Sequence, residues 1–192
     1  MNYFKRLPLF PALVMCILSV SILHQPLQAD NDEALSAVKT MIGLIRYNRD
    51  DRALEYIDLD GMTRYLLGNS YDQASAEQKQ RFTELLGEYI SLSAFPKARE
   101  YFNDVDLSYD APGEVDDRVH IRSAILYSGN EQLTFTWVMA DTDDGYRVID
   151  FLDAEGNSQM QTNKEKAVQP LLQQKGIPGV IAALETAVNR LK

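Results

Sequence analysis

The chain has 192 residues, of which 45% are hydrophobic and 24% are charged, and it carries a formal net charge of −9 and one cysteine. A chain this acidic is a poor candidate for binding nucleic acid or for adsorbing by charge to an anionic membrane surface. A single cysteine also excludes a disulfide within the chain, so the fold must be stabilised by the burial of apolar surface.

The first 29 residues have the order of a cleaved secretory signal. Two basic residues precede the apolar stretch 7–23, and the small residue Ala29 stands directly before an acidic segment. A retained membrane anchor is the alternative, but prolines interrupt the stretch and leave it shorter than the roughly 20 apolar residues of a spanning helix. We expect cleavage after Ala29. The mature chain, 30–192, would be periplasmic, would lack the only cysteine, Cys16, and would have a formal net charge of −11 because both basic residues are removed.

Residues 32–103 are predicted to be helical, because apolar residues recur there at helical spacing. A first helix covers the stripe from Leu35 to Ile45, and a later one ends at Gly68. The sequence Ser-Ala-Glu-Gln at 75–78 is a capping box, in which each end of the motif satisfies a backbone N–H of the other. It predicts a long amphipathic helix, which we expect to end before Pro96 and to be followed by a short helical turn.

From Val105 onward the apolar residues alternate with polar ones, as in strands. The pattern and its turn residues predict an antiparallel meander. A last strand is expected at 156–161, so that the sheet covers about 105–161. The four main strands are predicted at 105–110, 118–127, 132–140 and 145–153, with turns at 111–113, 128–130 and 143–145.

The strand predicted at 145–153 carries apolar side chains on both faces. Val148 and Leu152 share one face, whereas Ile149 and Phe151 share the other. We therefore expect other elements to cover this strand on both sides.

The C-terminal part, 162–191, is predicted to be helical again. Thr162 begins a second capping box, and Gly176 ends the helix that follows it. Pro178 then fits the first turn of a final helix, where its missing N–H does no harm. No linker or repeat divides the chain, so we predict one α+β domain, residues 30–192, with helices packed on one face of a curved antiparallel sheet.

Candidates for metal or nucleophilic chemistry are few. The segment 141–145 resembles part of a calcium loop, but the required glycine would fall at Tyr146 and no glutamate closes the loop, so an Asp-Gly hairpin turn is the simpler interpretation. His120 is the only histidine of the mature chain, and we interpret it as structural. The chain has no Gly-x-Ser-x-Gly motif and no mature thiol. We predict no metal, no cofactor and no catalytic residue.

Asp150 is the exception that keeps an enzymatic function open. It lies in the middle of an apolar strand, where an ionised carboxylate costs several kcal/mol unless it is paired. In a structural interpretation it pairs with Arg122 or Arg147, or it caps neighbouring backbone. In the enzymatic interpretation, Asp150 is the catalytic base of a small isomerase-like or hydratase-like enzyme. We favour the structural interpretation.

Two blocks of sequence resemble a known family. One is Tyr-Leu-Leu-Gly at 65–68, followed by Tyr71 and by Ala-Ser-Ala-Glu-Gln at 74–78. The other is YRVIDFLDAEGNS at 146–158. In order and spacing, and with 176–184 closing the pattern, these blocks are similar to those of the MlaC-type, or toluene-tolerance, periplasmic phospholipid-binding proteins. The resemblance extends over nearly the whole mature chain.

The resemblance implies a nuclear-transport-factor-like fold that holds acyl chains between sheet and helices and leaves the head group near solvent. It also implies a monomeric carrier without a permanent membrane anchor. Such a carrier moves phospholipid between an outer-membrane lipoprotein complex and an inner-membrane ABC transport complex, and so serves outer-membrane lipid asymmetry. An envelope adaptor that binds no ligand is a further alternative.

The expected pocket residues are the large apolar side chains of the helices and strands, although the same periodicity is typical of an ordinary core. They are Met62, Leu66, Phe82, Leu86, Tyr89, Ile90, Ile121, Ile125, Tyr127, Leu133, Phe135, Trp137, Met139, Val148 and Leu152.

The chain departs from the family pattern after Glu155-Gly156. The family continues with Val-Ser-Leu-Val, then Tyr-Arg and a Phe. This chain has Asn-Ser-Gln-Met at 157–160, then Asn163-Lys164 and Ala167. We therefore expect a more polar pocket wall from this segment.

Overall fold

The computed structural model describes residues 27–103, 105–127 and 131–192. Most of the predicted signal and the predicted turn at 128–130 lie outside the described residues. Within these ranges, no helix is long and apolar enough to span a membrane. The helices are α1 (Leu27–Arg46), α2 (Asp50–Leu54), α3 (Leu59–Leu67), α4 (Ala76–Tyr89), α5 (Phe95–Phe102), α6 (Gln159–Asn163) and α7 (Gln169–Leu191). The strands are β1 (Leu107–Tyr109), β2 (Gly113–Val115), β3 (Arg118–Tyr127), β4 (Glu131–Thr142) and β5 (Gly145–Leu152).

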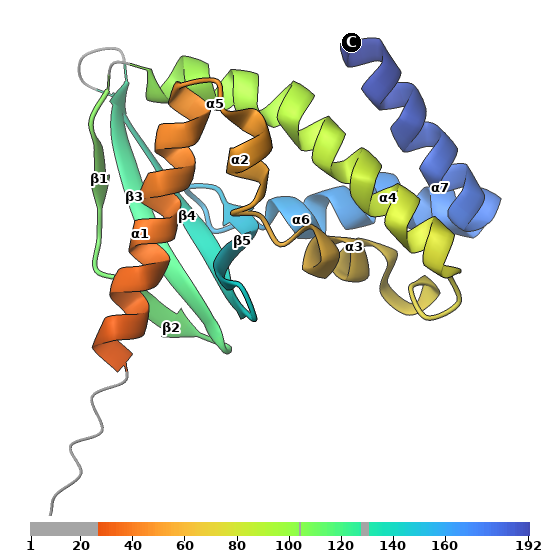
Figure 1. Cartoon of the computed structure of the whole chain (residues 1–192), viewed down its shortest axis with the longest axis horizontal. Helices are drawn as coiled ribbons and strands as arrows, with labels where there is room; N and C mark the ends of the chain where they lie inside the picture. Colours follow the sequence, from red (N-terminus) through yellow and green to blue (C-terminus); the bar gives the residue numbers. More distant parts are fainter. Residues whose placement is uncertain (1–26, 104, 128–130) are drawn as a thin grey trace, which may run out of the picture.

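One antiparallel sheet has the strand order β1-β3-β4-β5, and β2 pairs with the other half of β3. The sequence pattern predicts the strands β1, β3, β4 and β5 and their antiparallel order, but not β2. Figure 1 shows α1 crossing the sheet, with α3, α4, α6 and α7 gathered beyond the β5 edge. Because separate helical and antiparallel parts make up the fold, the predicted α+β class is confirmed.

The β5 edge is closed by the segment that leads into α3. Val148 N–H donates to the Tyr56 carbonyl over 2.8 Å, and Asp58 N–H donates to the Val148 carbonyl over 2.9 Å. The Asp58 side chain then caps α3 by accepting from Gly61 N–H at 2.8 Å. The backbone groups of an edge strand need hydrogen-bond partners. Because Asp58 both pairs with β5 and caps α3, this pairing also fixes where α3 begins.

A bulge between Val138 and Met139 changes which residues of β5 share a face. Phe151 is paired with Trp137, whereas Val148 is paired with Met139. Side chains of directly paired residues point to the same face, so Phe151 and Val148 lie on one side of the sheet. The prediction that they lie on opposite faces is wrong, because an added residue in one strand reverses the alternation beyond it.

The long predicted helix does not end before Pro96. Helix α4 continues through a π-helical turn, η2 (Ile90–Ala94), directly into α5. Pro96 lies in the first turn of α5, where a helix does not need the missing N–H. A second π-helical turn, η3 (Lys164–Val168), joins α6 to α7 in the same way.

The last predicted strand, 156–161, is not formed. Ser158 makes a single bridge to Leu152 and then caps α6, its hydroxyl accepting from Gln161 N–H at 2.8 Å. Thr162 therefore lies inside a helix, and the second predicted capping box is wrong. The predicted break at Gly176 is confirmed, since this glycine has φ 62° within α7.

The capping box at the start of α4 is confirmed and gives a stability prediction. Gln78 N–H donates to Ser75 Oγ at 3.1 Å, and Ser75 N–H donates to Gln78 Oε1 at 3.0 Å. Ser75→Ala should lower the free energy of unfolding by about 1 kcal/mol in urea denaturation, whereas Ser75→Gly should lower it by only about a few tenths of a kcal/mol. An unchanged midpoint for Ser75→Ala would show that the cap contributes nothing.

Candidate functional site

A large apolar cavity lies beside the β5 edge of the sheet, with a volume of about 790 Å³. Its walls come from β4 and β5, from the continuous helix α4-η2-α5, from α1 and α3, and from the C-terminal helices. The lining consists mostly of aliphatic and aromatic side chains, and its charged members are Lys97 and Asp150.

Eight predicted pocket residues line this cavity. They lie on α3, on α4-η2 and on the two strands nearest the β5 edge. They are Met62, Leu66, Phe82, Leu86, Tyr89, Ile90, Trp137 and Val148.

The other predicted pocket residues do not line the cavity. Most belong to the solid core, because α1 packs on β3 and β5 and fills the middle of the sheet. Leu133 is instead 40% exposed, and the side chain of Tyr127 lies outside the described part of the chain. The described members of this group are Ile121, Ile125, Leu133, Phe135, Met139 and Leu152.

Sequence reasoning missed the wall formed by the C-terminal helices. On α7, Val180, Leu184 and Ala187 recur at helical spacing and line the cavity together with Ala183. Their periodicity was the available signal. Two ion pairs hold this wall on α4, one between Arg81 and Glu185 and one between Lys192 and Glu88 at 2.8 Å.

An aromatic cluster supports the cavity where the sheet meets α5. The ring centroids of Phe135 and Phe151 lie 5.0 Å apart, and those of Trp137 and Phe151 lie 5.3 Å apart. Phe102 of α5 completes the cluster, 5.9 Å from Phe135. Phe102, Trp137 and Phe151 line the cavity, whereas Phe135 lies behind them. The bulge of β4 and β5 thus places an additional ring in the wall.

Both π-helical turns border the cavity. Ile90, Ser93 and Ala94 line it from η2, and Ala167 and Val168 line it from η3. A π-helical turn widens a helix by one residue and is frequently found at functional sites. Here the two turns redirect long helical segments around the hollow interior.

Asp150 caps backbone and does not pair with an arginine. Its carboxylate accepts from Phe151 N–H at 2.7 Å, from Met160 N–H at 3.0 Å and from the Ser158 hydroxyl. Arg147 instead pairs with Asp144 at 3.0 Å. The structural interpretation by backbone capping is therefore confirmed, and Asp150 connects β5 to the first turn of α6.

Asp150 also affects a neighbouring tyrosine. Burial is the main cause that raises the pKa of Tyr65, and the carboxylates of Asp150 and Glu165 raise it further. Tyr65 therefore remains protonated at neutral pH, and Lys164 lies over its ring at 4.3 Å from the centroid.

The capping role of Asp150 can be tested with an amide. Asp150→Asn keeps the shape but loses one acceptor oxygen, so a part-buried donor is left without its partner. We expect the free energy of unfolding to fall by about 1–3 kcal/mol in urea denaturation, with lipid binding retained. Asp110→Asn, at an exposed position, is the control. Equal stability of the two variants would contradict the capping role.

The Glu-Gly-Asn-Ser segment after β5 forms a compact loop around Asp153. This carboxylate accepts from the backbone N–H of Glu155 and Asn157 at 3.1 and 2.8 Å and from the Asn157 amide. The hydrogen bond from the Asn157 side-chain amide is the main cause that holds the pKa of Asp153 below its ordinary 3.8. The hydrogen bond from the Asn157 backbone N–H is the second. The stabilising effect of this carboxylate is complete above its ordinary pKa and is lost as the pH falls through the lowered pKa.

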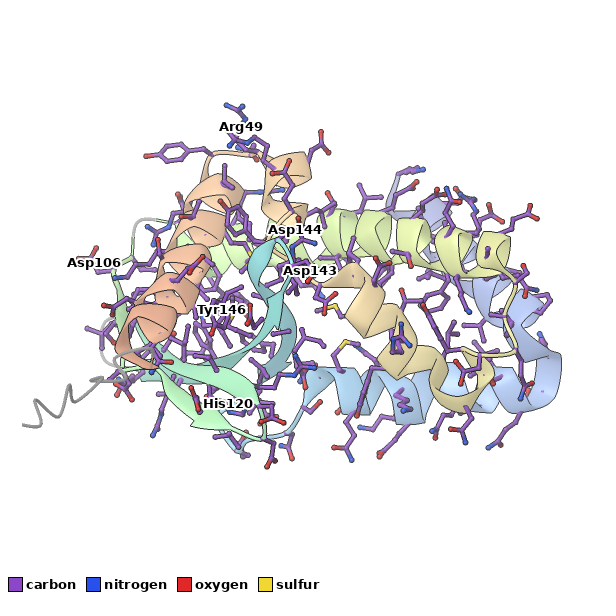
Figure 2. The ribbon with its side chains drawn as sticks, turned by 60° about the horizontal axis from the view of Figure 1, so that its bottom comes forward. Arg49, Asp106, His120, Asp143, Asp144 and Tyr146 are labelled. Atoms are coloured by element: carbon purple, nitrogen blue, oxygen red, sulfur yellow. The ribbon has the colours of Figure 1, made fainter. Side chains whose placement is uncertain are left out.

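The other sequence candidates lie away from the cavity. Figure 2 shows His120 at the end of the sheet remote from α4 and α7, and Asp143 and Asp144 at the tip of the β4–β5 hairpin. Thr142 is paired with Gly145, so the turn falls within the predicted 143–145, but its two central residues are Asp143 and Asp144, and Gly145 follows them with φ 95°. Among the described residues, no group of three His, Cys, Asp or Glu side chains could hold a metal ion.

Comparisons with known proteins agree on a family and on a fold. A family model described as MlaC protein matches residues 33–186. No curated protein matches the chain. A phospholipid-binding protein from Ralstonia solanacearum, solved in complex with a phospholipid, has a similar structure with a TM-score of 0.71 and 16% identity. The alignment covers 84% of this chain and 98% of that one, so the likeness shows a shared fold.

Proposed function

Because the chain belongs to the MlaC family, as its two sequence blocks indicate, we propose that it carries phospholipid through the periplasm with the acyl chains in its apolar cavity. The observation that carries the proposal is a cavity of about 790 Å³ walled by apolar side chains. Hydrocarbon is the ligand chemistry that such a surface accepts without leaving polar groups unpaired. The Ralstonia solanacearum protein of the same fold, which holds a phospholipid, supports this choice of ligand.

The volume indicates how much hydrocarbon can be held. A methylene group is about the size of a water molecule, whose share of liquid volume is about 30 Å³, so the cavity has room for roughly 26 methylene groups. This is most of the two chains of an ordinary diacyl phospholipid. At about 0.8 kcal/mol per buried methylene, the gain is at most roughly 20 kcal/mol, which is similar to what a bilayer supplies.

A ligand that is equally stable in protein and membrane can be exchanged but not driven in one direction. We infer that direction comes from partners, an outer-membrane lipoprotein complex and an inner-membrane ABC transport complex. The acidic composition of the chain, with a formal net charge of −9 before and −11 after the expected cleavage, supports delivery through protein partners because it does not favour adsorption to anionic lipid.

The alternatives have less support. An isomerase-like enzyme would need Asp150 as a free base, and its oxygens accept from three donors. An adaptor that binds no ligand has no use for a cavity of this size, because unfilled apolar volume lowers stability. We propose a binding protein without catalysis.

Release of labelled phospholipid from the loaded mature protein tests the carrier proposal. The acceptors are native envelope membranes, which contain the partner complexes, or vesicles made only from the lipids extracted from them. We expect transfer to be faster to the native membranes. Equal rates would contradict the need for partners, and failure of the protein to load any lipid would contradict the carrier proposal itself.

A further inference from the structure

Two rows of exposed side chains border the mouth of the cavity. One row, Ala94, Lys97 and Tyr101, lies on η2 and α5, and the other, Gln159, Asn163 and Ala167, lies on α6 and η3. Successive members of each row are three or four residues apart, so each row occupies one face of its helical segment. In Figure 1, α5 lies at the top of the molecule and α6 lies below it.

Three donors in these rows have no protein partner among the described residues. Lys97 takes part in none of the ion pairs or cation–π contacts, and the side-chain amides of Gln159 and Asn163 form no hydrogen bonds. Other lysines are engaged, for example Lys79 over Tyr71. The other charged lining residue, Asp150, is less exposed and already accepts from three donors, so Lys97 brings an unpaired positive charge to the mouth.

The second row places polar groups at the rim of an otherwise largely apolar cavity. Gln159, Asn163 and Ala167 lie on one helical face, where they provide two side-chain amides and open space. Acyl chains gain nothing from amide donors. This face is thus suited to the polar end of the ligand.

We propose that the mouth binds the phosphate-bearing head group of an anionic phospholipid, with Lys97 contacting the phosphate and Gln159 and Asn163 donating to phosphate or ester oxygens. This inference rests on the proposed function. An ammonium forms its strongest hydrogen bonds with an anionic oxygen, and each amide offers two N–H donors. A zwitterionic head group brings its own cation close to Lys97 and is bound less well.

The test uses delipidated mature protein and an equal detergent-solubilised mixture of phosphatidylglycerol, phosphatidylcholine and diacylglycerol with identical acyl chains. Bound lipids are quantified by mass spectrometry. We expect phosphatidylglycerol to be enriched, and Lys97→Met to lower its ratio to phosphatidylcholine by roughly fivefold, as for a charge-assisted contact at a partly exposed site. Lys175→Met, exposed and away from the cavity, should leave the ratio unchanged.

The amides have a separate readout. Gln159→Leu combined with Asn163→Leu should lower both phospholipids relative to diacylglycerol, by roughly threefold to tenfold. Inorganic phosphate should neither bind delipidated protein nor displace the lipid. If phosphate alone binds and competes, the site is for a free anion and the head-group assignment is wrong. Lipid loading with an unchanged ratio in Lys97→Met overturns this inference alone, whereas a wild-type protein that loads none of the three lipids overturns the proposed function.

Discussion

Filling the cavity from α7 is expected to abolish lipid loading while leaving the protein folded. Ala183 and Ala187 line the cavity one turn apart, so Ala183→Trp with Ala187→Trp places two indole rings inside it. The two substitutions together take up the space of roughly ten methylene groups at about 30 Å³ each, and each methylene contributes about 0.8 kcal/mol when it is buried. Bound phospholipid per protein, measured by mass spectrometry, should fall at least about tenfold, the equivalent of 1.4 kcal/mol.

A matched control lies on the same helix. Ala182 and Thr186 are also one turn apart, but both are exposed and neither lines the cavity. Ala182→Trp with Thr186→Trp should retain wild-type lipid loading. The cavity variant should unfold at a temperature no lower than the control, because it fills empty volume. Normal lipid content in a folded cavity variant would show that acyl chains bind elsewhere.

Removing the centre of the aromatic cluster should give the largest loss of stability. Phe135 is 3% exposed and contacts Phe102, Trp137 and Phe151. Phe135→Ala should lower the free energy of unfolding by about 3–5 kcal/mol. The midpoint of thermal unfolding should fall by about 6–20 °C, since each kcal/mol shifts a domain of this size by roughly 2–4 °C.

The control for this variant is an exposed residue on the neighbouring strand. Leu126 is 65% exposed, so Leu126→Ala should change stability by less than about 0.5 kcal/mol. Phe135 does not line the cavity, and the variant should still load lipid well below its unfolding midpoint. A Phe135→Ala protein as stable as Leu126→Ala would mean that the cluster does not support the sheet.

Local chemistry explains which parts of the fold can be predicted from sequence. The capping box at Ser75, the break at Gly176 and the Asp143-Asp144 turn each depend on hydrogen bonds or backbone angles within a few residues. The α+β class follows from the change of apolar period near residue 105. None of these features needs knowledge of distant contacts.

Features that depend on distant contacts are where prediction fails. The bulge beside Met139 reverses the alternation of β5 and moves Phe151 to the face of Val148. The turn η2 carries the helix past the expected end before Pro96. Ser158 begins a helix because it hydrogen-bonds to Asp150 and to its own helix, which a strand-like pattern does not reveal.

The position of the cavity is the clearest example. Ile121 and Leu86 have equally apolar patterns, but Ile121 is packed in the core and Leu86 faces open volume. The difference lies in where α1 packs on the sheet. Periodicity shows which side chains are buried and not what they are buried against.

Mass spectrometry of lipid extracted from the mature protein, purified from a bacterial periplasm, tests the lipid-filled cavity most directly. We predict near-stoichiometric phospholipid in the wild type and almost none in the variant with tryptophan at positions 183 and 187. A wild-type protein that is purified without lipid from a lipid-containing envelope, or that carries a ligand without acyl chains, would contradict the claim that the cavity holds phospholipid.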